Sequence, residues 1–310
     1  MLEVNDLNKR FGVVQAVKDL NFKVEQGEIL GFLGTNGAGK TTTMRIITCF
    51  IPASSGGVKV DGLNIREADL EVRRRIGYLP ESAPLYNDMI VTEYLNFAGQ
   101  IRGLQGNKLS SRVEEMIGIC GLGRMRRRLI GNLSKGYRQR VGLAQAMIHN
   151  PDLLILDEPM SGLDPNQIIE IRQLIKNIGR EKTVIYCSHI LPEVATTCSR
   201  IIIIHNGAIV ASGTPHELTS KSSSGQRYIL RAKGDKDALD RQLTAVDGVS
   251  KVSINDDGGG WYKVTAFMET EEERGDSIYR CAVENNWTLS ELTRETASLE
   301  DVFTQLTRGV

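Results

Sequence analysis

The octapeptide GTNGAGKT, from Gly34 to Thr41, has the residue types and spacing of a phosphate-binding loop, G-x-x-x-x-G-K-[ST]. Glycines permit backbone angles that turn successive N–H groups toward phosphate oxygens, and a helix that follows points its positive end at the same anion. In such a loop Lys40 reaches the β- and γ-phosphates, and the Thr41 hydroxyl binds Mg²⁺. We therefore predict that this segment binds ATP with Mg²⁺. The predicted nucleotide-binding residues are Gly34, Thr35, Asn36, Gly37, Ala38, Gly39, Lys40, Thr41 and Thr42.

Two carboxylates that could complete this chemistry follow the aliphatic run 153–156. Asp157 suits Mg²⁺, directly or through water, as a residue at the end of a buried strand. Glu158 comes next and could polarise the attacking water as a general base. Alone, an acidic pair of this kind more often ends a strand in solvent. The phosphate loop upstream favours the catalytic interpretation, in which Lys40 and Glu158 both act on the reaction.

A parallel sheet is the element that would bring these residues together. Aliphatic runs without alternation are typical of strands that are covered on both faces. Four such runs are found at residues 29–33, 153–156, 184–187 and 201–204. A helix is predicted to begin at about Lys40, and the mostly helical pattern from about 83 to 150 indicates an insertion between core strands. The first part of the chain is therefore predicted to be an α/β domain.

The composition changes at the polar stretch TSKSSSGQ, residues 219–226, which is typical of a linker. We predict an α/β domain at 1–220 and a small α+β domain at 221–310. The predicted elements of the second domain are strands at 228–232, 249–255 and 262–267, and helices at 235–246, 271–286 and after the capping pair Ser298 and Asp301. The 38 basic and 38 acidic residues of the chain divide into a net charge of +4 in residues 1–220 and −4 in residues 221–310. This balance argues against a general binder of polyanions.

Several motifs of the first 220 residues resemble, in the same order, those of the nucleotide-binding subunits of ABC (ATP-binding cassette) transporters. The resemblance implies a P-loop NTPase cassette, which is a RecA-like core with a helical insertion. Phe11, in KRFG, matches the aromatic residue that stacks on adenine. LSKGYRQR, residues 133–140, matches the signature motif, usually LSGGQ. The implied contacts to the γ-phosphate of a second subunit come from the signature residues Ser134, Lys135, Gly136 and Tyr137.

Three further positions take roles from the same resemblance. Asp164, in SGLDP, matches the loop that connects the two sites of a dimer, and His189, in CSHIL, matches the switch histidine that contacts the γ-phosphate. Glu81, in YLPE, stands where the family usually has a glutamine that senses Mg²⁺ and the attacking water. A carboxylate is also a hard oxygen ligand for Mg²⁺, but it cannot donate a hydrogen bond while it is ionised. The implied Mg²⁺ ligands are Thr41, Asp157 and Glu81.

YLPE and the terminal SLEDVFTQLT are similar to one branch of the family, the exporter ATPases with an extra C-terminal domain. That branch includes drug-resistance, sodium-efflux and gliding-motility subunits. The resemblance implies a second ATPase subunit, identical or paralogous, and a separate integral membrane permease. It also implies a peripheral location at the cytoplasmic face of the cell membrane.

Two other functions remain open at this point. One is a soluble ABC-type ATPase that acts on nucleic acid or in assembly, although such proteins often carry two cassettes or a long coiled-coil insertion. The other is an importer ATPase with a regulatory C-terminal domain. The longest aliphatic runs have four residues, so no transmembrane helix is predicted, and five scattered cysteines without a CxxC pair indicate reduced thiols. No specific nucleic-acid partner is expected.

Overall fold

The computed structural model describes residues 1–222, 226–268, 274–295 and 299–307. Its contacts divide the chain into two compact units, an N-terminal unit built on Met1–Pro215 and a C-terminal unit built on His216–Gln305. The polar stretch at 219–226 is less of a linker than predicted, because its first four residues lie in helix α8 (Pro215–Ser222) and Gln226 already begins a strand. The domain boundary at residue 220 stays a prediction.

A six-stranded sheet forms the centre of the N-terminal unit, in the order β10-β9-β3-β8-β7-β6. All neighbouring strands are parallel except the edge strand β10, which pairs antiparallel with β9. The strands are β3 (Ile29–Leu33), β6 (Ile76–Leu79), β7 (Leu153–Asp157), β8 (Thr183–Ser188), β9 (Arg200–His205) and β10 (Ala208–Gly213). The four predicted aliphatic strands are all present, and every residue of β7 and β8 is buried. Parallel pairing brings the carboxyl ends of β3, β7 and β8 to one edge of the sheet.

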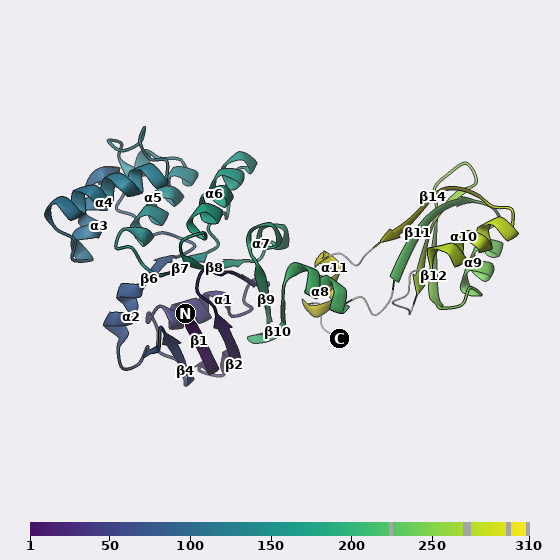
Figure 1. Ribbon diagram of the computed structural model, residues 1–310, viewed down its shortest axis with the longest axis horizontal. Helices are drawn as coiled ribbons and strands as arrows, with labels where there is room; N and C mark the ends of the chain where they lie inside the picture. The colour runs from purple at the N-terminus through teal and green to yellow at the C-terminus, as the bar shows by residue number, and fades with distance from the viewer. Residues whose placement is uncertain (223–225, 269–273, 296–298, 308–310) are drawn as a thin grey trace. The chain divides into compact units, whose positions relative to one another are not determined.

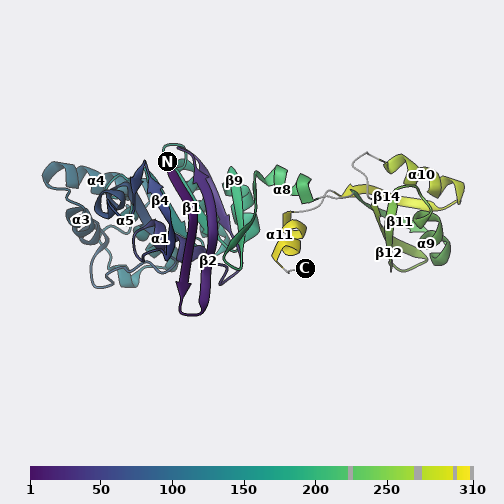
Figure 2. The same cartoon turned by 90° about the horizontal axis from the view of Figure 1, so that it is seen from below.

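A second, antiparallel sheet, in the order β2-β1-β4-β5, packs on the same core (Figure 2). Its strands are β1 (Leu2–Phe11), β2 (Val14–Val24), β4 (Ser55–Val60) and β5 (Leu63–Asn64). Phe22 and Phe32 join the two sheets, with ring centroids 5.6 Å apart. These strands were absent from the sequence prediction because register shifts between β1 and β2 break the simple alternation. Asp6 and Asp19 have positive φ angles of 47° and 45° in these shifted segments.

Helices surround the parallel sheet, and α3, α4 and α5 gather in one group in Figure 1. The helices of this unit are α1 (Lys40–Ile47), α2 (Asp69–Arg75), α3 (Val91–Ile101), α4 (Gly106–Ile119), the 3₁₀ turn η1 (Ile130–Asn132), α5 (Lys135–Met147), α6 (Pro165–Ile178) and α7 (Leu191–Thr197). Helices α3 to α5 confirm the predicted helical insertion between β6 and β7. Within the described residues, no helix combines the length and the apolar character that crossing a membrane requires.

The C-terminal unit is an α+β module with one antiparallel sheet, in the order β12-β13-β11-β14. Its elements are β11 (Gln226–Lys233), α9 (Lys236–Thr244), β12 (Val249–Asp256), β13 (Trp261–Met268), α10 (Gly275–Glu284) and β14 (Thr288–Glu295). Helix α11 (Leu299–Thr307) follows β14 in the chain. Buried residues of α9 and α10 pack with one face of the sheet. The predicted strands and helices are present, while β14 was not predicted because its sequence is mostly polar. Ser298 of the predicted cap lies outside the described residues.

Candidate active site

The phosphate loop connects the end of β3 to the start of α1, as the sequence predicted. Gly39 precedes the helix with a φ angle of 106°, a conformation that favours glycine. A Cβ atom at Gly39 would lie 2.6 Å from the Ala16 carbonyl oxygen, and one at Gly34 would lie 2.4 Å from the Ile204 carbonyl oxygen. The loop therefore requires glycine at these two positions because neighbouring backbone leaves no room for a side chain.

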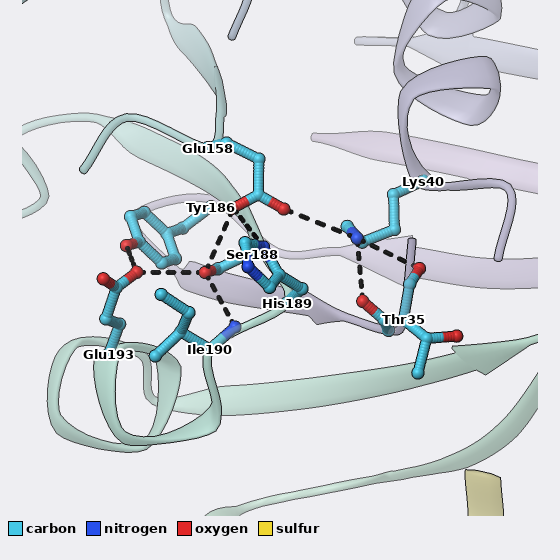
Figure 3. Close-up of polar contacts among 9 residues, drawn as sticks. Thr35, Lys40, Glu158, Tyr186, Ser188, His189, Ile190 and Glu193 are labelled. Carbon is cyan, nitrogen blue, oxygen red and sulfur yellow. Dashed lines mark hydrogen bonds and ion pairs between the residues drawn. The ribbon is translucent and has the colours of Figure 1, made fainter. Parts of the chain in front are cut away.

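Lys40, the first residue of α1, is turned back over the loop and is only 6% exposed. Its ammonium group donates hydrogen bonds to the carbonyl oxygens of Gly34, at 2.7 Å, and Thr35, at 3.3 Å. The same Nζ lies 3.4 Å from Oε1 of Glu158 (Figure 3). The structure thus brings the predicted phosphate-binding cation next to the predicted general base.

Glu158 follows β7 with a φ angle of 50°, so the chain turns sharply there. Its side chain is held from two sides. Oε1 faces Lys40, and Oε2 lies 2.9 Å from Nδ1 of His189 and 3.4 Å from Oγ of Ser188. Glu158 is 7% exposed, whereas the His189 side chain is 40% exposed. One carboxylate therefore connects the buried lysine to a histidine that solvent can reach (Figure 3).

Asp157 has the features of a carboxylate that is kept for a ligand. It is fully buried, and neither of its oxygens has a hydrogen-bond partner among the described residues. Burial raises the pKa of Asp157, while the nearby Thr41 hydroxyl and the Lys40 ammonium act in the opposite direction. Buried carboxylates without partners are costly unless a cation or a proton compensates for them. The unpaired oxygens of Asp157 beside the Thr41 hydroxyl therefore fit a hard divalent cation such as Mg²⁺.

A cleft of about 500 Å³ opens over this loop. Its lining includes five predicted site residues that are far apart in the sequence, namely Lys40, Thr41, Glu81, Glu158 and His189. Asn36, Gly37, Gly39 and Thr42 of the loop also line it. The cleft therefore collects a phosphate loop, two acidic groups, a lysine and a histidine at the carboxyl edge of one sheet.

Other predicted residues lie outside the lining of this cleft. Phe11, at the end of β1, is 50% exposed, and the Lys9 ammonium lies 5.0 Å from its ring centroid. Ser134 caps α5, where its hydroxyl accepts a hydrogen bond from the Tyr137 N–H at 3.4 Å. Asp164 caps α6 by accepting from the Gln167 N–H at 3.0 Å. The roles assigned to these residues stay predictions.

The two remaining signature residues are fixed by contacts within the chain. Lys135 lies so close to Gly162 that a Cβ atom there would be 2.3 Å from its ammonium nitrogen. Gly136 is packed against Gln167, whose side chain would lie 2.6 Å from an added Cβ atom. The start of α5 is therefore in contact with the SGLDP loop and the first turn of α6, and the signature packs against the predicted dimer loop of its own chain.

Three polar residues of the site were not predicted from the sequence. Tyr186 and Ser188 lie in β8, and Glu193 lies in α7, all of them at most 6% exposed. The tyrosine lies in the run 184–187 that the sequence marked only as a buried strand, and the serine follows that run directly. The sequence feature that could have predicted them is a polar residue inside a buried strand, followed a few residues later by an acidic residue.

The sequence is similar to known ABC transporter proteins. The ABC transporter family matches residues 17–161. The ABC transporter ATP-binding protein NatA of Bacillus subtilis is 37% identical over 240 residues, which cover 75% of this chain and 98% of NatA. The bacitracin transport ATP-binding protein BcrA of Bacillus licheniformis is 32% identical over 311 residues, covering 100% of this chain and 98% of BcrA.

A solved structure extends the likeness to the fold. The dimeric structure of a post-hydrolysis state of the ATP-binding cassette MJ0796, bound to ADP and Pi, aligns with a TM-score of 0.63 and 25% identity. The alignment covers 69% of this chain and 98% of that one. The sequence identity to full-length relatives and the cassette fold lead to one conclusion. This chain belongs to the ATP-binding proteins of the ABC transporter family.

Proposed function

We propose that this protein is an ATP-hydrolysing subunit that powers a separate membrane permease, in the direction of export. The observation that carries the proposal is the arrangement at the phosphate loop, where Lys40 and His189 both contact the carboxylate of Glu158. A lysine for the phosphates and a carboxylate for the water are the two groups that a hydrolytic phosphate site needs in one place.

The chemistry follows from what each side chain can do. The loop N–H groups and Lys40 hold the triphosphate, while Glu158 orients a water molecule and accepts its proton as the water attacks the γ-phosphate. His189 contacts Oε2 of Glu158 and also lines the cleft, from where it would reach the γ-phosphate. Thr41, Asp157 and Glu81 would hold Mg²⁺, which supplies charge neutralisation at the phosphate oxygens.

The signature residues are part of the same proposal, in a second copy of the chain. Ser134 and the first N–H groups of α5 form a helix start, which is suited to an anion. In the proposed two-fold dimer, this helix start faces the phosphate loop of the partner. The related MJ0796 cassette, which is dimeric with ADP and Pi, supports this arrangement.

A groove beside the helical insertion supports a permease partner. Its lining includes the exposed residues Leu70, Tyr86 and Ile101, together with Arg73 and Arg74. Exposed apolar side chains next to cations form a surface that suits an amphipathic helix. Near this groove, Arg73 already pairs with Asp69 on the exposed face of α2, so its charge is partly compensated within the chain.

The name of a relative supports a function in transport. BcrA is a bacitracin transport ATP-binding protein, and its likeness to this chain extends over the full length, including the C-terminal unit. We propose that the C-terminal unit regulates or dimerises the cassette. Truncation near residue 220 is expected to change the oligomeric state or the transport rate, and an unchanged protein in both respects would contradict this role.

The substitution Glu158→Gln tests the hydrolytic function in the full chain. It keeps the shape of the side chain but removes the base, so ATP binding is expected to persist while turnover falls by about 10²-fold or more. Steady-state hydrolysis and nucleotide binding measure the two effects, and wild-type turnover would remove Glu158 from its role.

Membrane fractionation with and without the co-expressed permease tests the transport function, because retention of the protein on membranes should require the permease.

A further inference from the structure

Behind Glu158, a chain of buried polar side chains runs from β8 into α7 (Figure 3). The Tyr186 hydroxyl donates to Oε2 of Glu193 at 2.8 Å, and Oγ of Ser188 lies 3.0 Å from the same oxygen. Oγ of Ser188 also lies 3.4 Å from Oε2 of Glu158. Two buried carboxylates are therefore connected through one hydroxyl group.

The backbone around this hydroxyl is fixed on both sides. The Ser188 carbonyl oxygen accepts a hydrogen bond from the N–H of Gly34 at 3.3 Å, and the Glu158 N–H donates to the Cys187 carbonyl oxygen at 3.0 Å. Side chains alternate along a strand, so Tyr186 and Ser188 point to the same face of β8. Figure 3 shows Glu193 approaching them from the neighbouring helix α7. The remaining freedom in this region lies in the side chains.

Ser188 is the residue of this chain whose hydrogen bond can change, because its hydroxyl has one proton and two possible acceptors. Its hydroxyl accepts from the Ile190 N–H at 3.1 Å and has one proton to give, for which Glu158 and Glu193 compete. Burial and the Glu193 carboxylate raise the pKa of Tyr186, so the phenol remains a donor to Glu193. The shorter distance, 3.0 Å against 3.4 Å, favours donation from Ser188 to Glu193. Glu193 thus sets the orientation of the hydroxyl that borders the proposed base.

We propose that Glu193 is a positioning residue for Glu158 and acts through Ser188. The fixed Ser188 oxygen and His189 limit where Oε2 of Glu158 can lie, and this leaves Oε1 directed at Lys40 and the cleft. A general base contributes only when its oxygen is held within reach of the attacking water, so a small displacement lowers the rate. The inference rests on the proposed role of Glu158 as the base.

The test compares Glu193→Gln, Ser188→Ala and the double variant in the full chain, with ATP and Mg²⁺ as substrates. Each single change is expected to lower kcat by about tenfold, which is the usual weight of one charged hydrogen bond, without changing KM for ATP. Because Glu193 acts through Ser188, the double variant should be no slower than the slower single variant. Tyr186→Phe removes the other hydroxyl that contacts Glu193 and should lower kcat by about threefold.

Glu28→Gln is the matched control, because Glu28 is also a largely buried carboxylate and its side chain is 12% exposed. Glu28 pairs with Arg200 at the opposite end of the sheet. The Glu28→Gln variant should therefore lose thermal stability but keep the wild-type kcat. Wild-type kcat in Glu193→Gln, or in Tyr186→Phe if Glu193→Gln does not fold, would overturn the inference. Additive losses in the double variant would also overturn it. If Glu158→Gln itself turned over ATP, the proposed function of Glu158 would fail, whereas an inactive Glu158→Gln beside fully active Ser188→Ala and Glu193→Gln would reject the positioning role alone.

Discussion

Charged side chains lie at both ends of the six-stranded sheet, but their hydrogen bonding differs between the two ends. At the amino end, Arg200 donates to both carboxylate oxygens of Glu28, at 2.7 and 3.1 Å, and the Glu25 N–H adds a hydrogen bond of 2.9 Å. At the carboxyl end, both oxygens of Asp157 lack partners among the described residues, and the closest approach of Lys40 to Glu158 is a longer 3.4 Å.

The difference separates charged residues that stabilise the fold from charged residues that are available to bind a ligand or take part in a reaction. Removing one partner of a hydrogen-bonded charge pair is destabilising because it leaves the other charge unpaired, while a buried charge that already lacks partners costs free energy that the fold must offset. Parallel strands place their carboxyl ends together, and the loops that follow them bring the incompletely paired groups to one cleft. Substitutions at the two ends should therefore have separable effects.

The largest expected effect concerns the ATP site at the carboxyl end of the sheet, which the signature of a second subunit would complete. Ser134→Arg and Glu158→Gln should each abolish hydrolysis, because one blocks the signature and the other removes the base. In a mixture, each hybrid dimer has one complete site if the signature acts in trans, so about a quarter of the wild-type rate should return. Steady-state hydrolysis after mixing measures this recovery. ATP binding by the isolated Ser134→Arg monomer should be unchanged.

Failure of the mixture to recover, with hybrid dimers present, would place the signature in the site of its own chain. A loss of nucleotide binding in monomeric Ser134→Arg would lead to the same conclusion. The mixture therefore distinguishes a trans role from the N-cap role that Ser134 already has in α5.

A smaller effect is expected in the phosphate loop. Gly39→Ala places a methyl group 2.6 Å from the Ala16 carbonyl oxygen at a φ angle of 106°, so the loop must move. We expect ATP affinity to fall by about tenfold or more, with a stability loss of about 2 kcal/mol. Gly37→Ala is the control, since its Cβ has nothing within 4 Å and only its φ angle of 80° is unfavourable. Equal losses of affinity in the two variants would show that backbone conformation alone, and not the close approach, matters.

At the amino end the effect should be on stability alone. Glu28→Gln leaves the Arg200 guanidinium without its carboxylate, and we expect a loss of about 2 kcal/mol in the free energy of unfolding. Chemical denaturation measures this loss, and steady-state hydrolysis should give wild-type kcat and KM. A fall in kcat at constant KM would show that the two ends of the sheet are coupled.

Much of this arrangement could be predicted from the sequence, for a physical reason. The phosphate loop is one continuous segment, and so is the Asp157–Glu158 pair. The residue types of each segment and the aliphatic run beside it are therefore enough to identify it. Tyr186 and Glu193 escaped prediction because their roles exist only through contacts between β8 and α7, which no local pattern encodes. Strands β1 and β2 escaped because bulges at Asp6 and Asp19 disrupt the period of two on which strand prediction depends.

The last expected effect is also at the amino end, but it is confined to acidic pH. His149 Nε2 lies 3.0 Å from the Ile76 carbonyl oxygen, and burial together with the Arg102 guanidinium lowers the pKa of His149 to about 4. Between about pH 6.5 and pH 4 the unfolded chain binds a proton that the folded chain does not, so stability falls as the pH falls through this window. His149→Gln removes this proton uptake and keeps an N–H for Ile76. The loss of unfolding free energy between pH 7 and pH 4.5 should then be smaller than in the wild type by about 2 kcal/mol. An identical acid sensitivity in both proteins, measured by urea denaturation, would assign the loss to other groups.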